Sequence, residues 1–405
     1  MRYCLLLFKR SVEDILMFPL ILLGKILSKR YPLKREYETF FFFPFYHIGG
    51  AEKVHLNIAK AIGNENCIIF FTRKSQNDLF YREFVASGCE MRDISKYTDN
   101  KWIYFVNIIF RGLIAAYINN QTKKPVVFNG QCNFGYKLSP WISKRIPQIE
   151  LIHSLCSFSY IRIPFLPFIS RTVMISTIRI QEHLDLYRRY GIPQRYDKKI
   201  TFIMNGIDLP LHKSEPNNDK KEFTVLYVGR GTPEKRVYLI GEIASLVHQT
   251  SPAMRFVFMG DVEVAVPERY RPHCIFLGNQ SDANEIDKIY RNSSVLILVS
   301  DTEGFPMVIM EAMARCLPIL STAVGEVPLH IKDGVNGYLL NDFLNEKAVV
   351  TEAKNYILQL AENPQLLHSI AANNIDYAYH HFGMDRFAEE YRNLFSDVKK
   401  EYNIS

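Results

Sequence analysis

The chain has 405 residues, a length that favours two domains over one. Hydrophobic residues make up 48% of it and charged residues 22%, which suits ordinary globular cores and excludes disordered and collagen-like classes. The formal net charge is +7, and residues 1–35 carry +6 of it through eight basic and two acidic side chains. The remainder is nearly neutral, which argues against a nucleic-acid-binding surface and predicts no nucleic-acid partner.

The N-terminal 35 residues combine this charge with apolar side chains. Their longest apolar run, Ile15–Gly24, has about half of the roughly 20 residues that a membrane-spanning helix needs, and Pro19 interrupts it. No small-residue cleavage site follows, so a cleaved signal peptide is not expected. We predict that residues 1–35 form a basic, apolar extension lying in the interface of an anionic membrane. The alternative is a helix packed on the body of the protein.

The seven cysteines are scattered, odd in number and never spaced as Cys-x-x-Cys. This pattern is typical of reduced thiols in a cytoplasmic protein. A metal site would need clustered ligands, and the sequence contains no such cluster, so we expect no metal and no cofactor.

From Thr39 onward, short apolar runs alternate with stretches of helical periodicity. Strand–helix alternation of this kind predicts a parallel sheet covered on both faces, and residues 36–211 are assigned to a first α/β domain. Its predicted strands are Thr39–Phe45, Cys67–Phe71, Val126–Asn129, Gln148–His153, Thr172–Ser176 and Thr201–Met204.

A polar stretch, residues 212–221, contains Pro216 and lacks apolar periodicity, so it is predicted to be a linker. The alternation restarts over residues 222–382, the second domain. Residues 383–405 are predicted to form an amphipathic helix that packs back on the N-terminal domain. Predicted strands of the second domain are Phe223–Gly229, Met254–Gly260, Cys274–Gly278, Val295–Ser300 and Pro318–Ser321, and predicted helices are Arg236–His248, Ala283–Arg291 and Met307–Ala314.

Ligands of open α/β sheets bind at the carboxyl ends of the strands, and the two domains are therefore expected to face one central cleft. Two cations, Arg230 and Lys235, follow the predicted strand Phe223–Gly229 and precede a helix. Arg can contact phosphate oxygens bidentately and Lys adds a compact charge, so the pair can converge on a diphosphate. A solvated basic loop is the alternative for this stretch alone.

A sharper signal is the segment Glu303-Gly304-Phe305-Pro306 with Glu311 eight residues after Glu303. Gly304 lets the backbone approach a ligand closely, and Pro306 suits the first turn of a helix. Carboxylates accept hydrogen bonds from vicinal diols such as those of a hexose or a ribose. The two glutamates therefore predict a sugar and nucleotide site.

A third segment, Gly49-Gly50-Ala51-Glu52, links the first strand to a helix and offers its N–H groups to an anion. Taken in order, this segment, Asn205-Gly206-Ile207-Asp208, Arg-x4-Lys and the two glutamates resemble the family 4 glycosyltransferases. The resemblance covers about residues 38–400. It implies two Rossmann-like α/β domains in the GT-B fold, here preceded by an N-terminal helical extension.

The resemblance also implies a role for each matching residue. Arg230 and Lys235 would neutralise the donor diphosphate. Glu303 would hold the donor sugar, with the backbone of Gly304, Phe305 and Pro306 beside it, and Glu311 would bind the ribose. In the first domain, Gly50 would face the phosphate and His153 the donor sugar. Three positions depart from the pattern: Cys316 replaces a Gly, Glu326 a second Gly, and Leu329 a Glu.

The implied reaction is a retaining, metal-independent transfer of a hexose-type sugar from a UDP-sugar or GDP-sugar to a glycan or lipid-linked acceptor. The expected setting is bacterial polysaccharide synthesis in the cytoplasm, with the enzyme peripheral on the inner face of the cell membrane. Two alternatives stay open. One is a nucleotide-sugar epimerase or hydrolase on the same fold, and the other is a catalytically silent nucleotide-sugar-binding protein.

Overall fold

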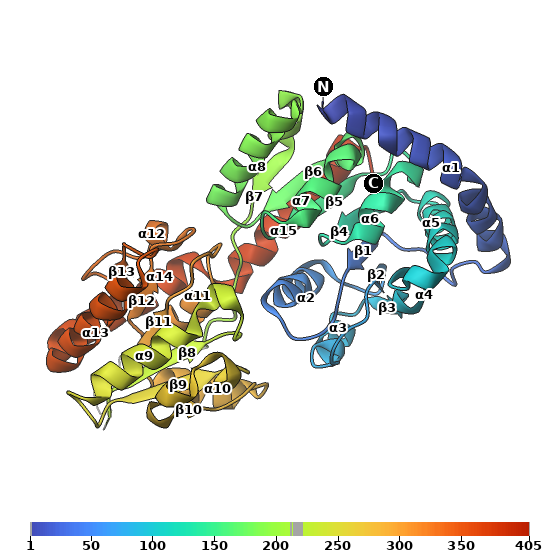
Figure 1. Cartoon of the computed structure of the whole chain (residues 1–405). Coiled ribbons are helices and arrows are strands. Elements are labelled where there is room, and N and C mark those ends of the chain that lie inside the picture. The colour runs from blue at the N-terminus through green and yellow to red at the C-terminus, as the bar shows by residue number, and fades with distance from the viewer. Residues whose placement is uncertain (1, 211–212, 214–221, 405) are drawn as a thin grey trace. The chain divides into compact units, whose positions relative to one another are not determined.

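The computed structural model describes residues 2–210, 213 and 222–404 (Figure 1). The chain divides into two compact units: unit 1 comprises Met1–Gly206 with Asp385–Ser405, and unit 2 comprises Ile207–Met384. Apart from Lys213, the predicted linker over residues 212–221 lies outside the described residues.

Unit 1 is built on a seven-stranded parallel sheet with the order β3-β2-β1-β4-β5-β6-β7. Its strands are β1 (Thr39–Phe43), β2 (Cys67–Phe71), β3 (Glu90–Asp93), β4 (Val126–Asn129), β5 (Gln148–Ile152), β6 (Arg171–Met174) and β7 (Ile200–Phe202). Its helices are α1 (Arg2–Arg30), α2 (Gly50–Ile62), α3 (Tyr81–Ala86), α4 (Ser95–Thr98), α5 (Tyr104–Asn119), α6 (Asn133–Leu138), α7 (Ser157–Ile161), α8 (Thr177–Tyr190) and α15 (Met384–Glu401).

The central strand β1 shows why this sheet needs cover on both faces. Its four phenylalanines are all buried, and successive side chains of a strand point to opposite faces. Phe42 stacks on Phe70 in the cluster that includes α5 residues, whereas Phe41 contacts Phe395 of α15. The C-terminal helix therefore closes one face of the unit 1 sheet.

Unit 2 holds a six-stranded parallel sheet with the order β10-β9-β8-β11-β12-β13, which is the Rossmann order 3-2-1-4-5-6. Unit 1 has the same order with one further strand. The strands of unit 2 are β8 (Thr224–Val228), β9 (Arg255–Met259), β10 (Ile275–Phe276), β11 (Val295–Leu298), β12 (Ile319–Thr322) and β13 (Gly337–Leu340). Its helices are α9 (Val237–His248), α10 (Ala283–Asn292), α11 (Met307–Met313), α12 (Val327–His330), α13 (Glu346–Glu362) and α14 (Pro364–His381).

Helix α1 packs along α5 through a face on which Ile21, Gly24 and Ser28 are buried, whereas Tyr3, near its start, is buried in a cluster with Ile163 and Tyr196. Two glycines bring the helix backbones together. A Cβ atom on Gly24 would lie 2.0 Å from the carbonyl oxygen of Ile109, and one on Gly112 would lie 2.1 Å from that of Ile21. Because both obstacles are backbone atoms, the helices can approach this closely only where Cβ atoms are missing.

One helical segment of the described chain, Lys101–Asn119, has the length and composition to cross a membrane. Half of its most apolar window is buried inside the protein. Since this segment includes α5, its apolar character is accounted for by its place between α1 and the unit 1 core.

Replacing Gly24 by alanine tests the α1–α5 contact. In an ordinary helix interior this change stabilises by about 1 kcal/mol. Here we expect the opposite sign, because the new methyl group would collide with backbone. Thermal unfolding and limited proteolysis should show a lower melting temperature or faster cleavage of α1, and a gain in stability would contradict this close packing.

Candidate active site

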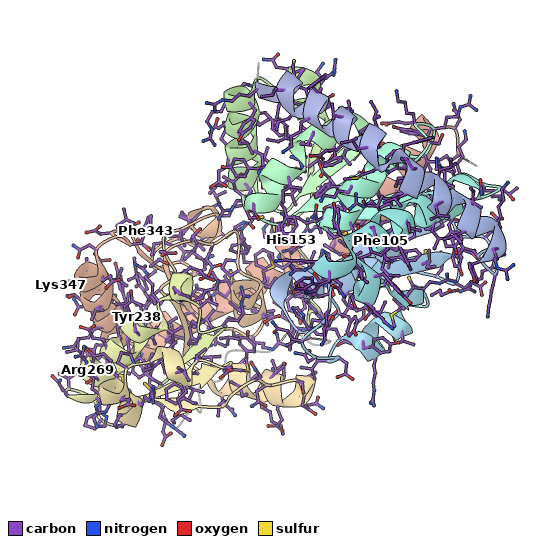
Figure 2. The ribbon with its side chains drawn as sticks, turned by 45° about the vertical axis from the view of Figure 1, so that its right-hand side comes forward. Phe105, His153, Tyr238, Arg269, Phe343 and Lys347 are labelled. Carbon is purple, nitrogen blue, oxygen red and sulfur yellow. The ribbon has the colours of Figure 1, made fainter. Side chains whose placement is uncertain are left out.

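The loop between β8 and α9 carries Lys235 and is fixed by the residue after it. Arg236 adopts a left-handed conformation, with φ of 46°. Its buried guanidinium donates hydrogen bonds to the carbonyl oxygens of Val299 and Phe343, each at 2.7 Å (Phe343 is labelled in Figure 2). Arg236 was expected to begin the helix, which instead starts at Val237. The reason is that Arg236 anchors the loop to the segments that follow β11 and β13.

Lys235 and Glu303 meet at the carboxyl ends of β8 and β11. The ammonium Nζ atom of Lys235 lies 2.5 Å from Oε1 of Glu303, and the Ser300 hydroxyl donates to the same oxygen at 2.7 Å. The two loops are also joined by backbone, since the Asp301 N–H donates to the Glu234 carbonyl. Arg230 is exposed on the β8–α9 loop. This edge of the unit 2 sheet thus combines two cations with a carboxylate.

The three residues after Glu303 differ in what they present. A Cβ atom on Gly304 would meet nothing within 4 Å, so its backbone borders open space. Phe305 is buried and stacks on His330, with ring centroids 4.1 Å apart. Pro306 precedes α11 as its N-cap and has no N–H. The N–H donors here therefore belong to Gly304 and Phe305, and the Phe305 side chain serves as an anchor in the core.

Glu311, on α11, is held by a side chain that the sequence did not single out. The fully buried Tyr290 of α10 donates its hydroxyl to Oε2 of Glu311 at 2.8 Å. Burial raises the pKa of Tyr290 well above its ordinary value, and the negative charge of the Glu311 carboxylate raises it further. The phenol therefore stays protonated and serves as a donor. The Arg315 guanidinium lies over the Tyr290 ring and is paired with Asp287. Tyr290 thereby fixes the orientation of the Glu311 carboxylate.

The positions that depart from the family pattern lie on both sides of this site. Gly325 has φ of 56°, and a Cβ atom there would lie 2.3 Å from the Glu303 carbonyl oxygen. The next residue, Glu326, is buried and donates its N–H to the Gly304 carbonyl at 2.9 Å. Cys316 takes the left-handed conformation, with φ of 61°, in which a glycine would be free of strain. Leu329 is exposed.

In unit 1, Gly50 is the first residue of α2, and a Cβ atom on it would meet nothing within 4 Å. The carboxylate of Glu52 folds back against Gly49, where a Cβ atom would lie 2.2 Å from Oε2. The other oxygen of Glu52 lies 3.8 Å from Nε2 of His47. The helix start is therefore open beside Gly50 and carries its own carboxylate beside Gly49.

His153 follows β5 and is paired with a second histidine, His55 of α2. Their Nε2 atoms are 3.0 Å apart (His153 is labelled in Figure 2). Burial lowers the pKa of His153 to about 4 and that of His55 well below its ordinary value. Both rings are therefore neutral near pH 7, and one donates its Nε2–H to the other. The backbone of His153 is fixed as well, because its N–H donates to Oε1 of Gln131 at 3.1 Å.

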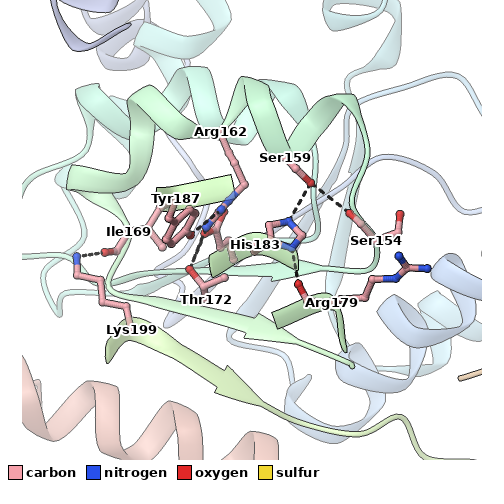
Figure 3. Close-up of polar contacts among 10 residues, drawn as sticks. Ser154, Ser159, Arg162, Ile169, Thr172, Arg179, His183, Tyr187 and Lys199 are labelled. Carbon is pink, nitrogen blue, oxygen red and sulfur yellow. Dashed lines mark hydrogen bonds and ion pairs between the residues drawn. The ribbon is translucent and has the colours of Figure 1, made fainter. Parts of the chain in front are cut away.

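A buried polar network supports β5 and the loop that follows His153 (Figure 3). Arg162 and Glu150 form a fully buried ion pair, and Tyr187 accepts a further hydrogen bond from Arg162 at 2.8 Å. Burial alone lowers the pKa of Arg162, but the Glu150 carboxylate leaves it well above its ordinary value.

Next to this pair, His183 and Ser159 are 2.9 Å apart, and Ser159 donates to the carbonyl of Ser154. These hydrogen bonds fix the loop that follows His153 at Ser154.

The structure brings Lys235 and Glu303 together, places Glu311 on the helix that follows, and leaves Arg230 on the surface of the same unit. Gly50 and His153 lie in unit 1. Sequence reasoning missed the residues that hold these groups: His55, Gln131, Arg236, Tyr290 and Ser300. Among the described residues, no three His, Cys, Asp or Glu side chains gather as a group that could hold a metal ion.

Comparison with known proteins places this arrangement in a class. Among solved structures, the chain resembles Anabaena Alr3699/HepE in complex with UDP-glucose, with a TM-score of 0.70 and 18% identity over 89% of this chain and 99% of that one. It also resembles the lipopolysaccharide outer core galactosyltransferase WaaB, with a TM-score of 0.63 and 20% identity over 89% and 99% of the two chains. The fold is therefore the GT-B fold predicted from the sequence.

Residues 210–377 match the family model of the glycosyl transferases group 1. The E. coli UDP-Gal:alpha-D-GlcNAc-diphosphoundecaprenol alpha-1,3-galactosyltransferase is 30% identical over 181 residues, which are 38% of this chain and 46% of that protein. The N-acetyl-alpha-D-glucosaminyl L-malate synthase of Bacillus anthracis is 23% identical over 219 residues, 51% and 55% of the two chains.

The matched regions thus span about half of these relatives. Residues 210–377 are therefore similar to the group 1 glycosyl transferases, in agreement with the resemblance seen in the sequence.

The lowered pKa of His153 predicts how stability depends on pH. The unfolded chain takes up a proton on this imidazole below about pH 6.5, but the folded chain does so only near pH 4. Stability is therefore lost as the pH falls between these values, by at most about 1.4 kcal/mol per pH unit for one group. Denaturant unfolding of His153→Gln should give a flatter pH dependence over this range.

The matched control is His368→Gln, because His368 is an exposed histidine of unit 2, away from the His153–His55 pair. Equal slopes for His153→Gln and the unmodified chain would contradict the neutral state of the half-buried His153.

Proposed function

We propose that the chain is a retaining, metal-independent glycosyltransferase. It moves a hexose-type sugar from a UDP-sugar or GDP-sugar to a glycan or lipid-linked acceptor in the synthesis of a bacterial cell-surface polysaccharide. The proposed location is the cytoplasm, with the enzyme peripheral on the inner face of the cell membrane.

The observation that carries this proposal is the meeting of Lys235 and Glu303 at the carboxyl ends of β8 and β11. Ligands of Rossmann-type sheets bind at this edge. A donor diphosphate would take Lys235, together with the exposed Arg230, as its cations. Glu303 would exchange its ion pair for hydrogen bonds from the sugar hydroxyls. The two side chains are thus already placed side by side for the two parts of one donor.

The chemistry follows from where charge develops. As the glycosidic bond to the donor breaks, negative charge accumulates on the leaving diphosphate. Cations that are already fixed in position stabilise this charge without reorganising. Arg236 contributes to this indirectly, because its hydrogen bonds to Val299 and Phe343 hold the loop that bears Lys235.

The donor and acceptor classes draw support from the similar proteins. Anabaena HepE is described in complex with UDP-glucose, and the E. coli relative is named for a UDP-Gal donor and a diphosphoundecaprenol-linked acceptor. A lipid-linked acceptor would also suit an enzyme held at a membrane.

Two other functions would leave different products. A nucleotide-sugar epimerase or hydrolase would convert the donor without any acceptor, and a silent binding protein would convert nothing. Product analysis with and without a glycan acceptor separates all three.

Replacing Lys235 by alanine should lower turnover by about 10²-fold or more, because one electrostatic stabiliser of the transition state is lost. The matched control is Lys288→Ala, since Lys288 is an exposed lysine of the same unit that pairs with Glu285 on its own helix. Steady-state kinetics on folded protein is the measurement. Near-normal turnover of Lys235→Ala would refute the role of Lys235.

Substitutions of the two glutamates should affect different quantities, namely nucleotide affinity and turnover. Glu311→Ala should weaken the binding of free UDP or GDP, and Tyr290→Phe should do so to a smaller extent, because it removes the hydrogen bond that orients the Glu311 carboxylate. Glu303→Gln should mainly lower turnover, because Glu303 contacts the reacting sugar. Calorimetry with nucleotide alone measures the first effect. Equal losses of nucleotide affinity in Glu303→Gln and Glu311→Ala would refute this division.

A further inference from the structure

Helix α1 exposes an apolar face along its whole length. Nine of its described residues are large apolar side chains with substantial exposure, and the highest values lie mid-helix, at 73% for Ile15 and 74% for Leu16. The outer stripe of α1, as we name this set, consists of Leu5, Phe8, Val12, Ile15, Leu16, Phe18, Leu22, Leu23 and Ile26. At 100° per residue these positions cluster on one side of the helix.

The opposite side of α1 is fixed to unit 1. The buried residues Tyr3, Ile21, Gly24 and Ser28 lie there, and the backbone contact of Gly24 with α5 leaves no room for a different seating. Near the N-terminal end, the Arg10 guanidinium reaches the Pro164 carbonyl at 3.3 Å and lies over the Phe168 ring. The helix is therefore anchored along its inner side, and its apolar outer stripe cannot turn inward.

The charges around the stripe indicate which kind of partner could bind it. Basic side chains stand at both ends of the segment, with Arg2 and Lys9 near its start and Lys29 and Arg30 at its end. The two acidic residues of α1 are engaged within the helix: Glu13 lies 4.0 Å from Lys9, and Asp14 lies 3.5 Å from Arg10.

A second copy of α1 laid on the stripe would bring basic ends near basic ends with no acidic partners. An anionic lipid surface would satisfy the same charges and bury the apolar side chains.

We propose that the outer stripe of α1 is a docking surface for an anionic lipid bilayer, on which the helix lies flat as a rigid part of unit 1. A helix of 29 residues is about 43 Å long, so the contact is extended rather than a point anchor. Docking in this way deepens the proposed function, on which it rests for its role: it would keep the enzyme beside lipid-linked acceptors.

The test compares Ile15→Glu/Leu16→Glu with a matched control, Val264→Glu/Leu344→Glu. The control residues are apolar side chains of unit 2 that are at least as exposed as Ile15 and Leu16, at 89% and 80%. Sedimentation with vesicles of phosphatidylcholine mixed with phosphatidylglycerol is the assay. The α1 variant should bind at least about tenfold more weakly than the unmodified chain, because apolar area is lost and negative charge faces the lipid. The control should bind normally. All four side chains are exposed, so both variants should keep the melting temperature of the unmodified chain.

Two further measurements sharpen the result. Binding of the unmodified chain should weaken but persist as salt rises, because salt screens the basic residues and not the apolar stripe. A tryptophan introduced as Leu16→Trp should shift its emission to the blue on adding vesicles, whereas Leu344→Trp should not. Undiminished vesicle binding of the α1 variant would overturn the proposal. A concentration-dependent dimer that only the α1 variant loses, without vesicle binding, would overturn it in favour of a second copy.

The outcome is separable from that of the proposed enzyme activity. The α1 variant should transfer sugar to a water-soluble acceptor fragment at the normal rate, since Ile15 and Leu16 lie outside the candidate active site. Vesicle binding without glycosyl transfer would remove the proposed function and leave the docking surface standing. Transfer without vesicle binding would do the reverse.

Discussion

The fold of each unit depends on one constraint, which is that a sheet of parallel strands must be covered on both faces. All strand pairs in the two described sheets are parallel. Their faces are therefore given to packing, as the four buried phenylalanines of β1 show. Polar chemistry is then confined to the strand ends. Lys235, Glu303 and His153 all lie there, each just beyond the last residue of a strand or in the loop that follows it.

The same constraint explains how much could be predicted from the sequence. Central strands such as β1, β2 and β11 are continuous apolar runs, and their positions were predicted within two residues. The edge strands β3 and β13 were missed. β3 reads Glu-Met-Arg-Asp and is only partly buried, because an edge strand has one neighbour and needs no apolar run. Its pairing with β2 is a property of the assembled sheet, which local composition does not encode.

The candidate site divides in a similar way. Functional groups that belong to a short contiguous motif, such as Glu303 with Gly304, could be predicted from the sequence. The groups that hold them could not, since each comes from a distant part of the chain: Tyr290 reaches Glu311 from another helix, and His55 reaches His153 across 98 residues. Arg236 was misassigned to a helix because its backbone conformation is set by carbonyl acceptors beyond the local sequence. These supports need long-range geometry that spacing alone cannot supply.

Helix α1 shows how one element can meet two opposite demands. Its inner side requires a glycine at position 24, because Gly24 and Gly112 of α5 set the distance between the two helix backbones. Its outer side carries large apolar residues that the described part of the protein leaves between 40% and 74% exposed, although burying them would be favourable. From the sequence, packing on the body and lying in a membrane were alternatives for this segment. In the structure they are compatible, since the packing contact uses only one side of the helix. A tightly fixed inner face also lowers the entropy lost when the outer face binds, because the helix is already formed and oriented. The glycine contact on the inner side therefore supports the proposed docking surface on the outer side.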